Sequence, residues 1–266
     1  MRTRRTLIIL WFYIFPAILL FSQQAPLPDR QAEALTRRSH AMLSGPVLVD
    51  DVTLKGKARR IAGSVDETGT VVLQALATGE ARLEFSFPSG SFSQVIAQSA
   101  KGPVGEWTGP DGKVHEMKQH NLATDAAWFF PTLVLRRMTD AGKSSVARVG
   151  RETQDGKPVE HLMASRQFKE MPEGVAPFME GLSRSEVYLD SSTLLPVSIS
   201  FNTHPDSDAL RNVPVEIRFS DYRSVNGAQA PFHVQKTING RLAFDLQFET
   251  ITVNSGLTPA IFSLQK

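Results

Sequence analysis

The last third of the chain, residues 213–254, constrains the fold most, because it alternates apolar and polar residues between tight-turn signals. Its central part runs from Phe232 to Phe248 around the dipeptide Asn239-Gly240. Asn-Gly between two alternating segments is the strongest short-range signal for a hairpin, since both central residues of a type I′ turn need positive φ. A second Asn-Gly pair occupies positions 226–227. The segment therefore predicts a β-meander.

The alternation also predicts that the meander buries one face. Successive side chains of a strand point to opposite faces. Arg241, Asp245 and Gln247 therefore share one side of their strand, and the other side carries only apolar residues: Leu242, Phe244, Leu246 and Phe248. Val215, Ile217 and Phe219 repeat the pattern upstream. A curved sheet with one dry face is expected.

The N-terminus has the layout of a secretory signal peptide. Three arginines at positions 2, 4 and 5 precede an apolar run over residues 7–21. A membrane-spanning helix needs about 20 apolar residues, and Pro16 would kink one. We predict a signal peptide over residues 1–25, cleaved near Ala25; an uncleaved signal that retains the chain at the inner membrane is the alternative.

Removal of the signal changes the charge balance. Lys plus Arg falls from 29 to 26 while Asp plus Glu stays at 27, so the mature chain is close to neutral. No charge argument for a nucleic-acid partner remains. The chain contains no cysteine, which excludes disulfides, thiolate metal sites and a lipid-acceptor cysteine. Without a linker or long charge run, residues 26–266 are expected to form a single domain.

The residues before the meander predict one helix and many short strands. The helix is expected over 31–43, with Asp29 as N-cap and Gly45-Pro46 as its stop. Strand-like segments recur about every ten residues, which suggests a sandwich or barrel: 52–61, 70–77, 81–87, 91–98, 145–153, 158–166, 186–189 and 196–201. The segment 101–112 is expected to be a glycine-rich turn, 172–182 to hold a short helix and 203–212 to be a polar loop.

One strongly apolar segment, residues 122–138, separates the two strand-rich halves. Proline is welcome in a first helical turn and costly in a helix interior. We therefore expect two short helices meeting at Pro131, with Arg136 and Arg137 near the end where cations complement the helix dipole. Such a segment needs a large apolar surface to cover, and the concave face of the curved sheet offers one.

The sequence offers no assembled catalytic motif. His115 to His120 resembles the zinc-protease pattern H-E-x-x-H but has one residue too many between its histidines. The serine elbow is incomplete, because the segment beginning at Gly181 lacks its second glycine. We expect no catalytic residue, no metal and no cofactor; a metal-assisted hydrolase using His115 and His120 is the weakest hypothesis.

The aromatic and aliphatic residues allow two interpretations. They fill the core, or they line an apolar ligand cavity that the helical segment leaves open. The candidate cavity residues are Phe85, Phe87, Trp128, Phe129, Phe130, Leu133, Phe201, Phe219, Leu242, Phe244, Leu246 and Phe248.

The order of these elements resembles the periplasmic lipoprotein-carrier (LolA/LolB-like) superfamily. Short sequence segments within about residues 29–265 carry the resemblance. They are 188–190 with 194–197, 221–223 with 225–227 and 231–232, and 253–254 before 261–262. The chain also resembles exported bacterial proteins that share the segment 128–131, a match that brings no function. No position matches the carrier's functional arginine, and the cysteine of lipid-anchored relatives is missing, so active lipoprotein transport does not follow.

The resemblance implies a mainly β (α+β) half-barrel, formed by a large curved antiparallel sheet and covered by a few helices. It also implies a lipid or lipoprotein acyl chain as partner. We expect a non-enzymatic, monomeric protein, periplasmic or secreted and close to a membrane, that binds an apolar ligand in the half-barrel. The alternative is an interaction or sensor module with a plugged cavity.

Overall fold

The computed structural model describes residues 29–140, 142–172 and 174–265. The predicted signal peptide, residues 1–25, lies outside these ranges. None of the helices within them has both the length and the apolar character needed to cross a membrane.

The described residues form a sheet of 13 strands in which every neighbouring pair is antiparallel. Its first half consists of β1 (Asp51–Ala62), β2 (Val65–Leu76), β3 (Ala81–Phe87), β4 (Gly90–Ser99), β5 (Gly102–Thr108) and β6 (Val114–Glu116). Its second half consists of β7 (Ser144–Gln154), β8 (Lys157–Arg166), β9 (Ser185–Asp190), β10 (Pro196–Thr203), β11 (Val213–Val225), β12 (Ala228–Ile238) and β13 (Arg241–Val253).

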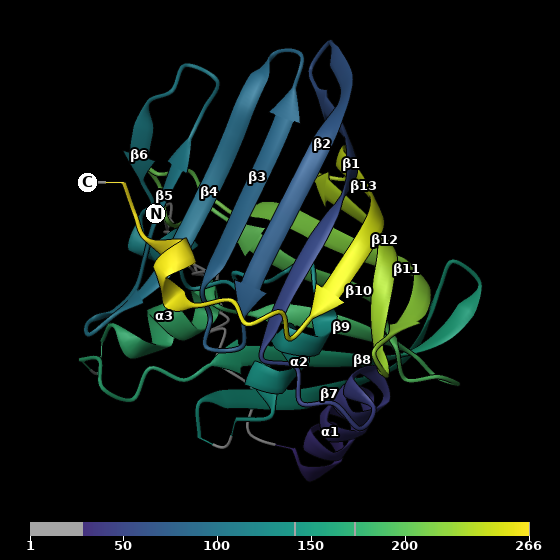
Figure 1. Cartoon of the computed structure of the whole chain (residues 1–266). Coiled ribbons are helices and arrows are strands. Elements are labelled where there is room, and N and C mark those ends of the chain that lie inside the picture. The colour runs from purple at the N-terminus through teal and green to yellow at the C-terminus, as the bar shows by residue number, and fades with distance from the viewer. Residues whose placement is uncertain (1–28, 141, 173, 266) are drawn as a thin grey trace, which may run out of the picture.

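Each half is a meander, and the pairing of β1 with β13 joins the two. The strands β2–β4 stand steeply in Figure 1, whereas β7–β10 run across it, so the sheet turns strongly between its halves. The edges β6 and β7 do not pair with each other, and the sheet stays open. The predicted half-barrel is confirmed.

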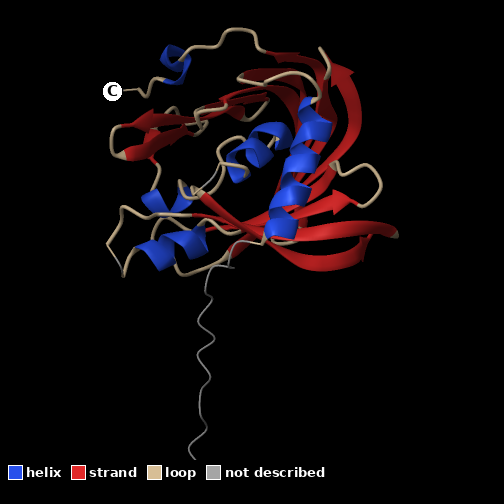
Figure 2. Ribbon diagram, turned by 90° about the horizontal axis from the view of Figure 1, so that it is seen from below, coloured by secondary structure: helices blue, strands red, loops and turns tan. Residues whose placement is uncertain are grey.

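Helices cover the inner side of the curved sheet, as Figure 2 shows from below. The first, α1 (Arg30–Ser44), packs against α2 (Pro131–Met138) and against β7 and β12. Asp29 caps α1 by accepting a hydrogen bond from the Gln31 backbone N–H, and Gly45 ends it, as predicted. The short helix α3 (Ala176–Leu182) and the 3-10 turns η1 (Gln119–Asn121) and η2 (Pro259–Phe262) complete the fold.

The closing meander follows its sequence signals closely. Asn226 and Asn239 have positive φ of 51° each, and the glycines that follow them have φ of 93° and 71°. This is the backbone that type I′ turns require. Leu246 and Phe248 are buried on the inner face and Gln247 is exposed on the outer face. The prediction of a one-face-buried meander is confirmed.

The apolar segment 122–138 contains one α-helix rather than the two that were predicted. Residues preceding a proline avoid the helical region. Phe130 accordingly is extended, with φ −133° and ψ 94°, and α2 begins at Pro131. Upstream, the Asp125 carboxylate accepts a hydrogen bond from the Ala127 backbone N–H at 2.8 Å. This local bond competes with helical pairing and shapes residues 122–130 as a series of turns.

The segment 101–112 also differs from its prediction, because most of it is strand β5. The strand pairs with β4 and β6, and its Gly105 lies where a Cβ would be 3.0 Å from the Leu122 side chain and 2.9 Å from the Met117 sulfur. The glycine thus lets the segment after β6 pack directly on the sheet. Pro103, near the start of the strand, costs little.

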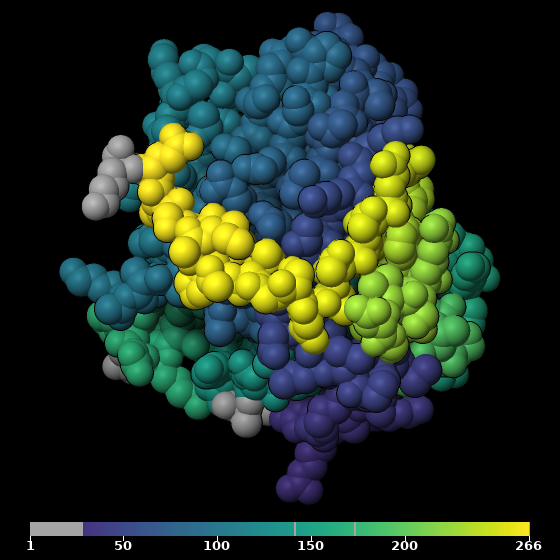
Figure 3. Space-filling model, viewed as in Figure 1, coloured from purple at the N-terminus to yellow at the C-terminus, as the bar shows by residue number. Residues whose placement is uncertain are grey.

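The C-terminal segment crosses the outer face of β2–β4, where Figure 3 shows it as a yellow band. Phe262 is fully buried against Leu76 and Val95. The buried carboxylate of Asp51 accepts hydrogen bonds from the backbone N–H groups of Ser255 and Gly256 at 2.8 and 2.9 Å. These contacts attach the C-terminal segment to the first half of the sheet.

Candidate functional site

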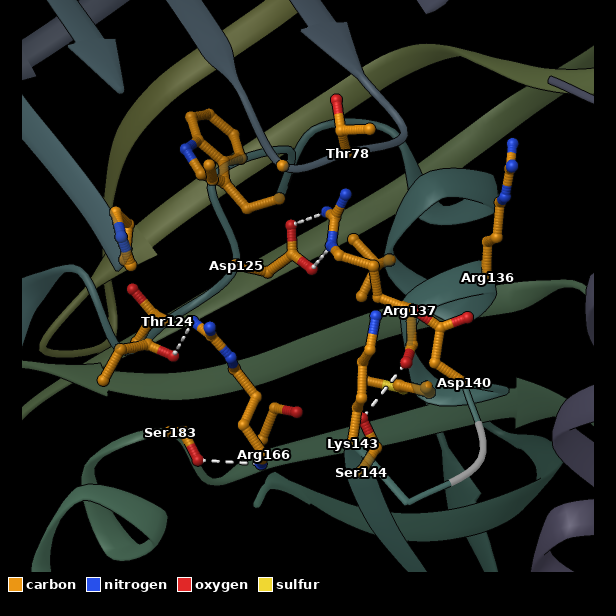
Figure 4. A pocket seen from close by; sticks show the side chains of 18 of the residues that line it. Thr78, Thr124, Asp125, Arg136, Arg137, Asp140, Lys143, Ser144, Arg166 and Ser183 are labelled. Carbon is orange, nitrogen blue, oxygen red and sulfur yellow. Dashed lines mark hydrogen bonds and ion pairs between the residues drawn. The ribbon is translucent and has the colours of Figure 1, made fainter. Parts of the chain in front are cut away.

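A cavity of about 790 Å³ lies between the two halves of the sheet (Figure 4). One wall comes from the ends of β2, β4 and β5, and the opposite wall from β8, β9 and β10. The turns over 122–128 and helix α2, which connect the open edges, complete it. Ligand pockets commonly measure roughly 300–1,000 Å³, so the volume suits a small molecule or one acyl chain.

Apolar side chains from both halves line the cavity together with polar and charged ones. The larger apolar side chains are Leu76, Ile96, Leu122, Trp128, Val134, Met138, Ile199 and Phe201. Trp128 is only 7% exposed and packs edge-on against Phe129, with ring centroids 5.7 Å apart. The connecting segment therefore contributes to the cavity wall without filling the whole half-barrel.

A bidentate ion pair holds the connecting segment, residues 122–138, between the two open edges of the sheet. The Arg137 guanidinium donates through Nε to Asp125 Oδ2 at 2.8 Å and through Nη2 to Asp125 Oδ1. It also donates to the Ala77 carbonyl oxygen, at 3.5 Å, in the turn between β2 and β3. The pair thus ties together α2, the turns before it and the first half of the sheet.

The cavity also has basic residues that no carboxylate neutralises by direct contact. Arg136 pairs with Asp50 at 2.9 Å. Lys143 and Arg166, in contrast, form no ion pair with any carboxylate among the described residues. The Arg166 guanidinium makes long hydrogen bonds, 3.4 Å each, to the carbonyl oxygens of Leu122 and Ala123, and it lies 5.3 Å from the centre of the Phe168 ring.

The backbone holds Arg166 at the end of β8. Its N–H donates to Ser183 Oγ at 2.9 Å, and that hydroxyl donates to the Glu180 carbonyl at 2.8 Å, which attaches the strand end to α3. The side chain remains accessible to solvent, although protein atoms surround it. Burial lowers the pKa of Arg166, and Asp125 opposes the shift. An arginine nevertheless remains charged at neutral pH.

A further cation, Lys236, lies on the inner face of β12. Its Nζ is 4.5 Å from the centre of the Trp128 ring, a cation–π contact on a side chain that itself lines the cavity. No ion pair to Lys236 exists among the described residues. Burial lowers its pKa from 10.5 to about 8.

This burial predicts that Lys236→Met stabilises the protein at neutral pH, by about 1–3 kcal/mol after allowance for the lost Trp128 contact. The folded protein releases the Lys236 proton near pH 8 and the unfolded chain near pH 10.5. Between these values the unfolded state binds more protons, so wild-type stability rises with pH and the advantage of the variant shrinks.

Urea denaturation at pH 7 and pH 10 measures this effect. Lys157→Met, at an exposed lysine, serves as the control and should change little at either pH. An advantage of Lys236→Met that is the same at both pH values would contradict the assignment of a desolvated ammonium.

The structure distributes the twelve predicted cavity residues between the cavity wall and the core. Trp128 and Phe201 line the cavity. Phe129, Phe130, Leu133 and Leu246 are fully buried in the core, and Phe219 and Phe248 are nearly so. Phe85 stacks against Phe87 and contacts Phe244, with centroids 6.1 and 5.1 Å apart, and Leu242 is half-buried nearby on β13.

The two histidines of the weakest hypothesis lie in different surroundings. His115, on β6, stacks on Trp107 with centroids 4.2 Å apart. His120, in η1, has its Nε2 3.2 Å from the Pro205 carbonyl oxygen. Within the described residues, no group of three or more His, Cys, Asp and Glu is arranged to hold a metal ion.

Comparison with known proteins is informative at the level of structure. No protein-family model matches the sequence, and no curated protein matches it. Solved structures do match over most of the chain. A DUF1329 family protein from Desulfovibrio piger shares 13% identity at a TM-score of 0.57, covering 90% of this chain and 98% of that one.

Two further structures point to the same fold. A LolA superfamily protein from Nitrosomonas europaea shares 10% identity at a TM-score of 0.55, over 88% of this chain and 97% of that one. A domain from Vibrio parahaemolyticus, described as a candidate outer-membrane lipoprotein-sorting protein, shares 13% identity at 0.56, over 87% and 96%. The chain has a LolA-like fold. At these identities the similarity concerns the fold alone, and the predicted fold-level resemblance is confirmed.

Sequence reasoning missed the charged part of the cavity. Asp125, Arg137, Lys143 and Arg166 line the cavity from separate segments of the chain, and Lys236 approaches its wall through the contact with Trp128. A partial signal was available: Lys236 interrupts an otherwise apolar face of β12, whose inward residues include Ala230 and Val234.

Proposed function

We propose that this chain is an exported, non-enzymatic cell-envelope protein that binds a lipid, a lipoprotein acyl chain or another apolar ligand in its half-barrel. The observation that supports this proposal most is the 790 Å³ cavity, about half of whose lining residues are apolar. Protein interiors contain few voids larger than a water molecule, so a space of this size exceeds what core packing alone leaves. The LolA-like fold supports the same proposal, because proteins of this fold include one described as lipoprotein-sorting.

The cavity favours this function over an interaction or sensor module with a plugged interior. That alternative requires the connecting segment to fill the concave face. Phe129, Phe130 and Leu133 do fill part of it, whereas Trp128 and Val134, themselves largely buried, form part of the cavity wall. The export signal, the location in the periplasm and the monomeric state are part of the proposal and rest on the sequence.

Native mass spectrometry of the protein purified from the periplasm of a Gram-negative host tests the proposal. We expect a fraction of the protein to carry a co-purified lipid, and the delipidated protein to bind a fluorescent acyl probe. A protein that carries no lipid and binds no acyl probe would refute the proposed function and favour the interaction module.

A further inference from the structure

Arg166 and Lys143 lie beside each other at one end of the cavity. Ser144 pairs with Arg166 across β7 and β8, and the Gln167 N–H donates to the Lys143 carbonyl oxygen at 2.8 Å. Both basic side chains therefore project from neighbouring strand ends. Figure 4 shows them in one space between β8 and the connecting segment, where Arg166 extends toward Thr124 and Lys143 extends toward Arg137, whose guanidinium is turned to Asp125.

The charges around this space do not cancel. Four basic residues and three acidic residues line the cavity. Two of the acids are engaged: Asp50 by Arg136 and Asp125 by Arg137. The third, Asp140, forms no ion pair among the described residues. Two uncompensated cations thus face one uncompensated carboxylate, at the border of an apolar interior.

We propose that this end of the cavity binds the anionic head group, a phosphate or a carboxylate, of a single-chain lipid whose tail enters the apolar interior. The inference rests on the proposed function and specifies its ligand. Arginine presents a planar fork of donors that matches either anion, and lysine adds a compact charge. An acyl chain attached to a neutral backbone would bring no anion to either cation, so the site selects a free anionic lipid over an acylated polypeptide.

Competition against a fluorescent acyl probe tests this selection. The competitors share a twelve-carbon chain and differ in the head group: dodecyl phosphate, dodecanoate, neutral dodecyl maltoside and a neutral dodecanoyl peptide. We expect both anionic competitors to bind about tenfold more tightly than the neutral ones, with the advantage reduced by high salt. Equal binding of all four would overturn the inference and leave the proposed function intact, whereas binding of none would refute the proposed function.

Charge variants locate the site. Arg166→Gln and Lys143→Gln should each weaken binding of the anionic competitors about tenfold and leave the neutral ones unchanged. Asp140→Asn should strengthen anionic binding, a gain that a purely structural role would not produce. Lys157→Gln, at the opposite end of β8 and about 30 Å away, is the matched control and should have no effect.

Two results would place the anion elsewhere. If Lys143→Gln, which alters an exposed side chain and preserves the fold, leaves anionic binding unchanged, the proposed site is wrong. If Lys236→Met alone removes the preference for anions, the head group lies behind Trp128 rather than at the strand ends, and the inference is overturned.

Discussion

Replacing Gly56 with alanine is expected to lower the free energy of unfolding by more than about 4 kcal/mol. Gly56 lies where β1 meets β13, the pairing that joins the two halves of the sheet. A Cβ at this position would be 2.1 Å from the Gln247 carbonyl oxygen and 2.6 Å from the Phe248 Cα. Both are backbone atoms, so no side-chain rotation relieves the overlap and the strands must separate.

The Gly56 contact coincides with an irregularity in the pairing. Lys55 pairs with Thr250 and Gly56 with Phe248, so Glu249 is the extra residue of a β-bulge. Bulges increase local twist, which fits the turn of the sheet between its halves. Urea denaturation measures the effect, with Gly150→Ala as control, because a Cβ at Gly150 meets nothing within 4 Å. Equal stability of the two variants would contradict the predicted backbone overlap at Gly56, where β1 pairs with β13.

Truncating Phe129 to alanine should cost about 3–5 kcal/mol. The ring is completely buried and packs edge-on against Trp128, so its removal leaves a cavity that the sheet cannot close. Phe178→Ala is the matched control, since that ring on α3 is 42% exposed and its loss should cost less than about 1 kcal/mol. Thermal or urea unfolding compares them. A cost for Phe129→Ala as small as the control's would show that the connecting segment is not part of the core.

The sequence was sufficient for features that are local. Asn239-Gly240 predicts its hairpin because the turn geometry and the alternation of its flanking strands are encoded within a few residues. The cap of α1 at Asp29 and the start of α2 at Pro131 are likewise local signals. The resemblance added the half-barrel, which the structure confirms.

Features that depend on distant segments were not predictable in the same way. Within β5, Gly105 admits Leu122 beside the strand, a contact between separate segments that propensity does not anticipate. The Arg166 and Lys143 site depends on the register between β7 and β8, and the aromatic residues divide between core and cavity according to how α2 packs. Composition indicated an apolar interior but not which part of it stays open.

Quenching of Trp128 fluorescence by a bromine-labelled acyl chain tests whether an acyl chain enters the cavity, because this ring forms part of the cavity wall. Residues 26–266 contain the whole described core and two tryptophans, Trp107 and Trp128. In the Trp107→Phe variant, we expect saturable quenching of Trp128 by a mid-chain brominated fatty acid, with no quenching by the unbrominated acid. In the Trp128→Phe variant, Trp107, which is 39% exposed on β5, should not be quenched. Absence of quenching at Trp128, or equal quenching at both positions, would contradict binding of an acyl chain in this cavity.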